Sequence, residues 1–155
     1  MKIIIQVTLA LLLLFGLAAC TQNDKVIGNR FGMWKVTEMT INGEKDIEYQ
    51  NNMYWSFQGD LIMMTLVPEN PFEATSISYG GCIKKGDKLI LEYRNSDEVH
   101  PDPDDNYYSP LPESHLPTNT QIILGIIYLS GSRMELKYES PEDNEIIVYQ
   151  LKKWD

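Results

Sequence analysis

The feature that most constrains the fold is a series of short segments, after residue 30, in which apolar and polar side chains alternate. Segment 133–139 is the clearest, because Met134, Leu136 and Tyr138 alternate with charged residues. A period of two places successive side chains on opposite faces of a β-strand, whereas a helix needs an apolar period of about 3.6 residues. The pattern predicts eight strands, at 32–41, 52–58, 61–67, 74–84, 88–94, 120–129, 133–139 and 145–153.

Two kinds of connection alternate between these segments. Compact glycine turns at 58–60, 85–87 and 130–132 are typical of β-hairpins. The other connections are longer and lie at 42–51, 68–73, 95–119 and 140–144. In an up-and-down arrangement, alternate connections lie at the same end of the sheet. The chain therefore predicts a closed end, formed by the compact turns, and an open end, rimmed by the long loops.

Eight antiparallel strands can close into a barrel, which removes the exposed sheet edges. The interior of such a barrel is either filled by side chains or just wide enough for one small ligand. Both possibilities stay open at this point, because the predicted inward-facing residues are large. They are Trp34, Val36, Trp55, Phe57, Met134, Leu136 and Tyr138, with Met63 or Met64.

Short motifs resemble those of a known family. Gly32-Met33-Trp34 resembles the Gly-x-Trp signature of lipocalins and of the lipocalin-like lipoproteins of Bacteroidetes, and the segment 54–60 resembles the aromatic strand and Gly/Asp turn of the latter. In that fold a tryptophan plugs the closed end under a basic residue of the last strand. The resemblance implies an all-β, eight-stranded lipocalin-like barrel over 31–155, with Gly32, Trp34 and Lys152 (or Lys153) as its structural signature.

The N-terminal residues resemble a bacterial lipoprotein signal. Met1-Lys2 is followed by an apolar run over 3–15 and by the lipobox-like sequence Leu17-Ala18-Ala19-Cys20. The apolar run is shorter than the roughly 20 residues that span a bilayer, which disfavours the alternative of a transmembrane anchor. The resemblance implies a signal peptide at 1–19, acylation of Cys20 by chains such as palmitate, and a tether over 20–30.

The residue after Cys20 bears on the membrane that holds the anchor. Thr21 stands where many inner-membrane lipoproteins have aspartate, so we expect an outer-membrane anchor in the cell envelope. Whether the protein faces the periplasm or the cell exterior stays open.

Charge and cysteine content exclude some partners. Removing Lys2 with the signal changes the formal net charge from −9 to −10, which makes a poor surface for nucleic acid or anionic headgroups. If Cys20 carries lipid, Cys82 remains alone and no internal disulfide can form.

The loop 95–119 is the main candidate for a binding element. It holds six acidic residues, both histidines (His100 and His115) and no lysine or arginine. Asp102, Asp104 and Asp105 offer hard oxygen ligands that suit Ca²⁺, but they lack the spacing of an EF-hand loop. Zinc bound by the two histidines is a weaker alternative. The favoured interpretation is a solvated, proline-stiffened loop without a metal or cofactor.

The remaining candidates point to binding rather than catalysis. No common hydrolase, metalloprotease or nucleotide motif is present, and Cys82 follows Gly80-Gly81 within a strand as a small buried thiol would. We expect a small apolar or amphipathic ligand at the open end. A packed barrel that contacts an envelope protein or a glycan through its loops is the alternative. Candidate ligand contacts are Trp55, Phe57, Met64, Tyr107, Tyr108, Leu111 and Tyr138. An equal alternative for the three loop residues, Tyr107, Tyr108 and Leu111, is that they pin the loop to the barrel rim.

Overall fold

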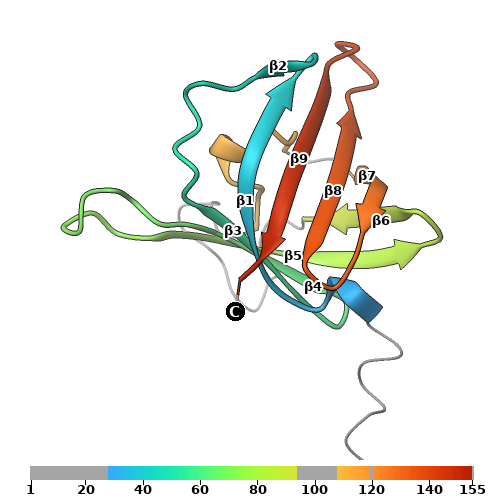
Figure 1. Ribbon diagram of the computed structural model, residues 1–155, viewed down its shortest axis with the longest axis horizontal. Coiled ribbons are helices and arrows are strands. Elements are labelled where there is room, and N and C mark those ends of the chain that lie inside the picture. The colour runs from blue at the N-terminus through green and yellow to red at the C-terminus, as the bar shows by residue number, and fades with distance from the viewer. Residues whose placement is uncertain (1–27, 94–107, 119–120, 155) are drawn as a thin grey trace, which may run out of the picture.

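The computed structural model describes residues 28–93, 108–118 and 121–154 of the chain (Figure 1). Its elements are almost all strands. They are η1 (Gly28–Arg30), β1 (Gly32–Ile41), β2 (Glu44–Lys45), β3 (Met53–Gln58), β4 (Leu61–Leu66), β5 (Ser76–Lys85), β6 (Lys88–Glu92), η2 (Pro112–Ser114), β7 (Ile122–Leu129), β8 (Arg133–Glu139) and β9 (Ile146–Lys153). Within these residues, no helix has the length and apolar character needed to cross a membrane.

The strands form one closed antiparallel barrel. Each strand from β3 to β9 pairs with its neighbour in chain order, and β1 pairs with both β3 and β9. The first and last long strands therefore meet, which leaves the eight long strands without an unpaired sheet edge. The prediction of an eight-stranded up-and-down barrel is confirmed, and each strand begins and ends within two residues of its expected position.

The short strand β2 was not predicted. It pairs with the end of β1 through a hairpin whose turn is Asn42-Gly43, and both residues have positive φ angles, of 53° and 85°. Asn-Gly is the sequence most typical of this tight turn, because both central positions require positive φ. The signal was present inside the segment 42–51 that the pattern assigned to a long loop.

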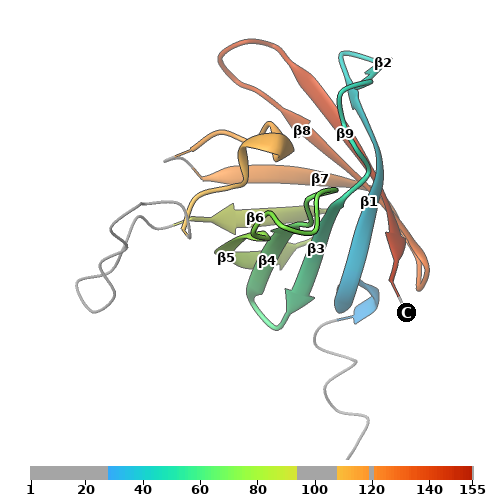
Figure 2. The same cartoon turned by 90° about the vertical axis from the view of Figure 1, so that its left-hand side faces the viewer.

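The two ends of the barrel differ as the connections predicted. The turns β3–β4, β5–β6 and β7–β8 lie at one end, together with η1, which precedes β1. Figure 2 shows η1 and the end of β9 at the lower side of the molecule, opposite the β8–β9 loop. The segment 108–118, which contains η2, lies instead at the open end. Residues 1–27 thus precede an element of the closed end.

A single apolar core fills the space between the strands. It contains the inward side chains of every long strand and extends to Leu111 and Leu116 of the segment 108–118. Strand β8 follows the expected alternation, with Met134, Leu136 and Tyr138 buried. All predicted inward residues are buried, and of the pair in β4 it is Met64, not Met63, that points inward.

Candidate functional site

A tryptophan and a lysine close one end of the barrel. The Trp34 side chain is fully buried, and its indole N–H donates a hydrogen bond to the Arg30 carbonyl at 2.7 Å. Lys153 Nζ lies 4.5 Å from the centre of the Trp34 ring and donates to the Phe31 carbonyl. A cation over an indole face is a favourable arrangement.

The choice of lysine corrects one expectation. The sequence predicted Lys152, or alternatively Lys153, as the basic residue that packs on Trp34. The structure shows that Lys153 packs there, whereas the Lys152 side chain is exposed on the outer side of β9. Alternation in β9 explains the difference, because Leu151 and Lys153 point to the inner face of the strand and Lys152 points to the outer face. Gly32 fits the same arrangement: its φ is +102°, and a Cβ there would lie 3.0 Å from Lys153 Cε and Nζ.

Arg30 is a buried residue of the closed end that the sequence analysis missed. Its side chain is about 5% exposed and donates to the Gly59 carbonyl at 2.9 Å and the Cys82 carbonyl at 3.2 Å. It also lies 3.7 Å from the exposed carboxylate of Asp60. The guanidinium thereby joins η1 to the β3–β4 turn and to strand β5. Arg30 stands before the first periodic segment, so no alternation marked it as inward.

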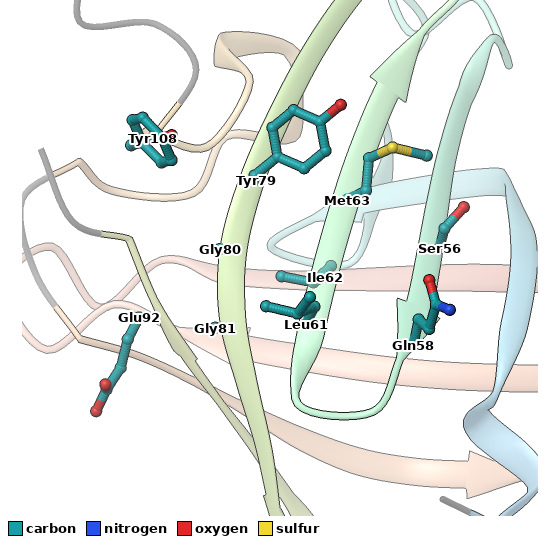
Figure 3. Close-up of a pocket in the computed structure, with 10 residues that line it drawn as sticks. All are labelled: Ser56, Gln58, Leu61, Ile62, Met63, Tyr79, Gly80, Gly81, Glu92 and Tyr108. Atoms are coloured by element: carbon teal, nitrogen blue, oxygen red, sulfur yellow. The ribbon is translucent and has the colours of Figure 1, made fainter. Parts of the chain in front are cut away.

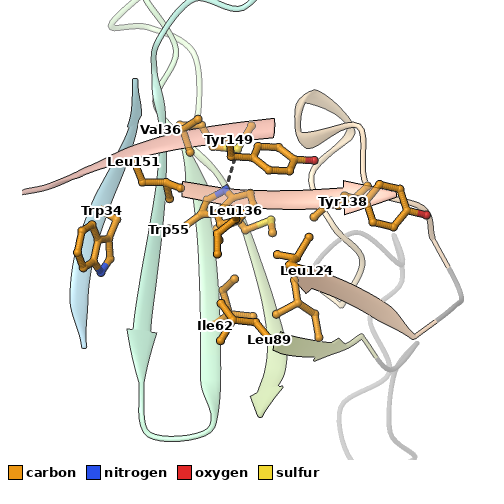
Figure 4. Close-up of a cluster of buried hydrophobic side chains, with 14 of the residues drawn as sticks. Trp34, Val36, Trp55, Ile62, Leu89, Leu124, Leu136, Tyr138, Tyr149 and Leu151 are labelled. Carbon is orange, nitrogen blue, oxygen red and sulfur yellow. Dashed lines mark hydrogen bonds between the residues drawn. The ribbon is translucent and has the colours of Figure 1, made fainter. Parts of the chain in front are cut away.

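Side chains fill the barrel interior (Figure 4). Trp34, Trp55, Phe57, Met64 and Tyr149 are each at most 1% exposed. The rings of Trp55 and Tyr149 pack at 4.9 Å between centres. Of the two interiors that eight strands allow, the structure has the filled one. Trp55, Phe57, Met64 and the nearly buried Tyr138 are therefore core residues in this conformation, and their role as ligand contacts stays a prediction.

The segment 108–118 covers the open end, and we call it the cap. Leu111 and Leu116 enter the core, and the buried Ser114 hydroxyl donates to the Leu111 carbonyl at 2.6 Å. Tyr149, on β9, donates its phenol O–H to the Ser114 carbonyl at 2.7 Å. Leu111 is thus part of the core, which agrees with the alternative that it pins the loop to the barrel. Tyr107 lies outside the described residues.

A groove of about 460 Å³ runs along the outer wall of β3, β4 and β5 (Figure 3). Its apolar surface comes from Leu61, Met63 and Tyr79, and its polar edge from other residues of the wall and cap. Leu61 and Tyr79 are 63% and 44% exposed. The lining residues are Ser56, Gln58, Leu61, Ile62, Met63, Tyr79, Gly80, Gly81, Glu92 and Tyr108.

Gly81 creates the space in this groove. It lies directly between Leu61 of β4 and Glu92 of β6 in the sheet register, and it has no side chain to fill the gap. A Cβ at Gly81 would meet its nearest atoms at 3.6 Å or more, which is ordinary contact. A larger side chain therefore fits the backbone at this position and would occupy the groove. Of the candidate ligand contacts that the structure describes, Tyr108 is the one that lines it.

Comparisons with known proteins agree with this geometry. A family model described as a lipocalin-like domain matches residues 13–142. The chain belongs to the lipocalin-like domain family. The comparison with curated proteins found no match.

Two solved structures have a similar fold. A lipocalin-like protein from Bacteroides uniformis is 16% identical with a TM-score of 0.56, over 82% of this chain and all (100%) of that one. An uncharacterized protein from Bacteroides eggerthii is 14% identical with a TM-score of 0.55, over 80% of this chain and 98% of that one. At these identities the likeness shows the fold alone.

The lipocalin-like domain also has a polar cleft at its mouth, between the cap and the loop after β2. The cleft has a volume of about 470 Å³ and is lined by Asp46, Glu48, Tyr49, Gln50, Asn52, Leu66, Pro112, Glu113 and His115. His115 Nε2 lies 3.3 Å from Asp46 Oδ2, which joins the cap to this loop. The mouth of this barrel is therefore polar and acidic, not apolar.

The remaining candidate residues are the thiol of Cys82 and the possible metal ligands of the acidic loop. Cys82 is fully buried, as expected, and burial raises the pKa of its thiol to about 11. Among the described residues, no three His, Cys, Asp or Glu side chains come together as a metal site. His100, Asp102, Asp104 and Asp105 lie outside the described residues, so the favoured interpretation of a loop without a metal stays a prediction, with calcium and zinc as its alternatives.

Proposed function

We propose that this lipocalin-like protein is a lipid-anchored binding protein of the cell envelope that holds a small amphipathic molecule in its wall groove. The observation that supports the site is the groove itself, with Leu61, Met63 and Tyr79 as an apolar floor and Ser56, Gln58 and Glu92 as a polar edge. A volume of about 460 Å³ falls within the range of ordinary ligand pockets. The ligand class is the one expected from the sequence, but the proposed site is the wall groove in place of the open end.

The packed interior argues for the wall. A ligand in the barrel would have to displace side chains such as Trp55 and Phe57, which are at most 1% exposed. Exposing one large apolar side chain costs about 1.5–3 kcal/mol, and a small ligand would need to displace several. The wall groove, in contrast, is open without any rearrangement of the core.

A Gly81→Leu substitution tests the groove. The chain from Thr21 onwards, which needs no detergent, is titrated with a fluorescent long-chain fatty-acid analogue as the probe. We expect the leucine side chain to fill the groove and to weaken binding at least 10-fold, about 1.4 kcal/mol. Gly125→Leu is the matched control, because Gly125 also faces outward from a strand and a Cβ there would meet its nearest atom at 3.8 Å.

Two outcomes would contradict the groove. Equal weakening by both leucine variants would indicate a general effect, and unchanged binding in Gly81→Leu would place the probe elsewhere. Native mass spectrometry of protein from its own host would then identify any ligand that copurifies, and a ligand retained by Gly81→Leu would also argue against the wall.

The anchor rests on Cys20 and on chain order. Because residues 1–27 precede η1, a lipid on Cys20 would attach the protein through its closed end. Several acyl chains make membrane attachment effectively permanent. We expect Cys20→Ser to release the protein into the soluble fraction, since the substitution removes the thiol that receives the lipid. If the variant still sediments with membranes after a high-salt wash, the anchor lies elsewhere.

The buried thiol of Cys82 argues against a catalytic function and in favour of a binding function. A nucleophilic cysteine needs a lowered pKa, whereas burial raises that of Cys82 to about 11. Cys82 therefore stays protonated at neutral pH. The proposal includes neither a cofactor nor a catalytic residue.

The polar mouth cleft favours a second candidate function, contact with a glycan or an envelope protein through the loops. Tyr49 and Asn52 supply an aromatic ring and an amide beside the His115–Asp46 pair. A ring suits the apolar face of a sugar, and an amide suits its hydroxyls. We expect Asn52→Ala to weaken such binding on a glycan array while leaving the fatty-acid probe unaffected. Loss of probe binding would instead link the two sites.

A further inference from the structure

The charged side chains of the barrel are sorted by end. Residues of η1, of the compact turns and of the strand ends beside them (28–35, 56–63, 82–90, 126–135 and 151–154) include eight of the ten described lysines and arginines. They include only three of the fifteen described acidic residues, namely Asp60, Asp87 and Glu135. The basic residues of this closed end are Arg30, Lys35, Lys84, Lys85, Lys88, Arg133, Lys152 and Lys153.

The rest of the described barrel has the opposite charge. Twelve acidic residues lie there, beside two lysines, Lys45 and Lys137. Both lysines are paired with carboxylates, Lys45 with Glu38 at 3.0 Å and Lys137 with Glu139 at 2.7 Å. The chain is acidic as a whole, yet its closed end is basic: Arg30 is buried, and the other seven cations there outnumber the three carboxylates. A molecule with this distribution turns its basic end towards a negatively charged plane.

Aromatic and apolar side chains are exposed among the basic residues of the closed end. Trp154 is 52% exposed, and its backbone N–H donates to the Met33 carbonyl at 2.9 Å, which places it beside the start of β1. Its ring packs edge-on against Tyr54 at 5.4 Å, and Lys35 Nζ lies within 6 Å of both ring centres. Phe31, Met33 and Tyr128 are also exposed at this end.

Exposed apolar residues alone do not distinguish the two ends. Ile47 and Phe72 are exposed at the open end as well, but they lie in sequence beside acidic residues such as Glu48 and Glu73. Anionic headgroups would repel that combination. Tryptophan, tyrosine and basic side chains together are typical of segments that rest in the headgroup region of a membrane.

We infer that the closed end docks directly on a bilayer that contains anionic phospholipids. The chain that precedes Gly28 starts from this end, so a lipid on Cys20 would hold the basic surface against the headgroups. This inference rests on the proposed anchoring and adds a second contact to it, in which Lys85, Arg133 and Lys152 contact lipid phosphates and Trp154 enters the interface. The acidic mouth and its polar cleft then point away from the membrane.

Trp154 provides an intrinsic probe of this contact, because Trp34 and Trp55 are fully buried in the barrel. The full-length acylated protein is reconstituted into vesicles with brominated acyl chains, made of phosphatidylcholine with or without phosphatidylglycerol. We expect strong quenching of Trp154 in the anionic vesicles, weak quenching in pure phosphatidylcholine, and reversal by 0.5 M salt, since salt screens exposed charges. Trp154→Phe should remove the quenchable emission.

Charge variants test whether the basic surface carries the contact. A variant with Lys85→Gln, Arg133→Gln and Lys152→Gln removes one exposed cation from each of three parts of the closed end. Each of the three substitutions should weaken binding to the anionic vesicles about fivefold. The control carries Lys45→Gln and Lys137→Gln, outside the closed end. Circular dichroism checks that both variants are folded.

The outcomes separate this inference from the anchor. Flotation with vesicles after a high-salt wash tests whether the lipid anchor holds the protein, and quenching of Trp154 emission tests whether the closed end docks. If the protein does not float, the anchor proposal fails, and cosedimentation of the soluble chain with the same vesicles at low salt then measures docking. Equal quenching or cosedimentation with both lipid compositions, or in the triple variant and the wild type, would overturn the inference.

Discussion

At the scale of single residues, Gly32 and Lys153 depend on each other above the Trp34 ring. The lysine ammonium occupies the place that a Cβ on Gly32 would approach at 3.0 Å, and the glycine has a φ of +102° that other residues rarely adopt. The Gly-x-Trp signature is thus explained by the backbone path into β1 and by the cation that covers the ring.

Gly32→Ala tests this explanation. We expect a loss of about 1–3 kcal/mol in the free energy of unfolding, from backbone strain together with displacement of the lysine. Gly125→Ala is the control, because its Cβ would have ordinary contacts and a strand usually gains from losing a glycine. Urea denaturation measures both. A loss no larger than that of the control would contradict the strained-glycine explanation.

The buried thiol of Cys82 predicts a pH dependence of stability. Its pKa rises from the ordinary 9.0 to about 11, chiefly because burial disfavours the thiolate. Below pH 9 both the folded and the unfolded chain hold the proton, so the stabilisation is complete. Between pH 9 and 11 the unfolded chain releases the proton first, and stability falls by about 2–3 kcal/mol as the pH rises.

Urea midpoints from pH 8 to 10 test this dependence, with Cys82→Ala as the comparison. We expect the variant to show a shallower fall than the wild type between pH 9 and 10. Above pH 10 both chains should lose stability, since burial also raises the pKa of Tyr49 to about 12. Equal slopes below pH 10 would show that the thiol is not protected in the folded state.

At the scale of elements, period-two alternation was enough to place all eight long strands, because inward and outward positions differ strongly in a small barrel. It was not enough for the cap. The region 95–119 reads as one acidic loop, yet Leu111 and Leu116 enter the core. Their partners, Tyr149 above all, come from strands distant in sequence, and local patterns carry no information about such contacts. The wall groove was missed for a related reason: it arises from Gly81 lying beside Leu61 across two strands.

Tyr149→Phe tests the attachment of the cap. The variant loses the buried hydrogen bond from the phenol to the Ser114 carbonyl, and we expect a loss of about 1–2 kcal/mol in the free energy of unfolding. In the variant, backbone amides at 114–116 should exchange hydrogen faster than in the wild type, whereas the exchange of β3 amides should stay the same. Tyr138→Phe is the control, because Tyr138 is also nearly buried, and no hydrogen bond of its hydroxyl is found within the described residues. Unchanged exchange in Tyr149→Phe would mean that Leu111 and Leu116 alone hold the cap.

At the scale of the whole molecule, net charge was a poor guide to the surface. A formal charge of −9 for the chain argued against anionic headgroups, but strand order places most of the basic residues at the closed end. Composition sums over both ends and loses this difference. Only the topology, in which three turns and both outer strand ends meet, shows where each charge lies.

Closure of the barrel also predicts how the molecule unfolds. The core is continuous from Trp34 at the closed end, through Trp55 and Tyr149, to Leu116 of the cap, and the pairing of β1 with β9 joins the two ends of the described chain. Small domains with one core usually unfold in a single step. We expect the urea transitions followed by tryptophan emission, far-ultraviolet circular dichroism and reaction of the Cys82 thiol to share one midpoint.

The thiol is an independent reporter, because it is fully buried beside Arg30 and becomes reactive only when the closed end opens. Thiol labelling at a clearly lower urea concentration than the loss of β-structure would show that the closed end opens separately from the rest of the barrel.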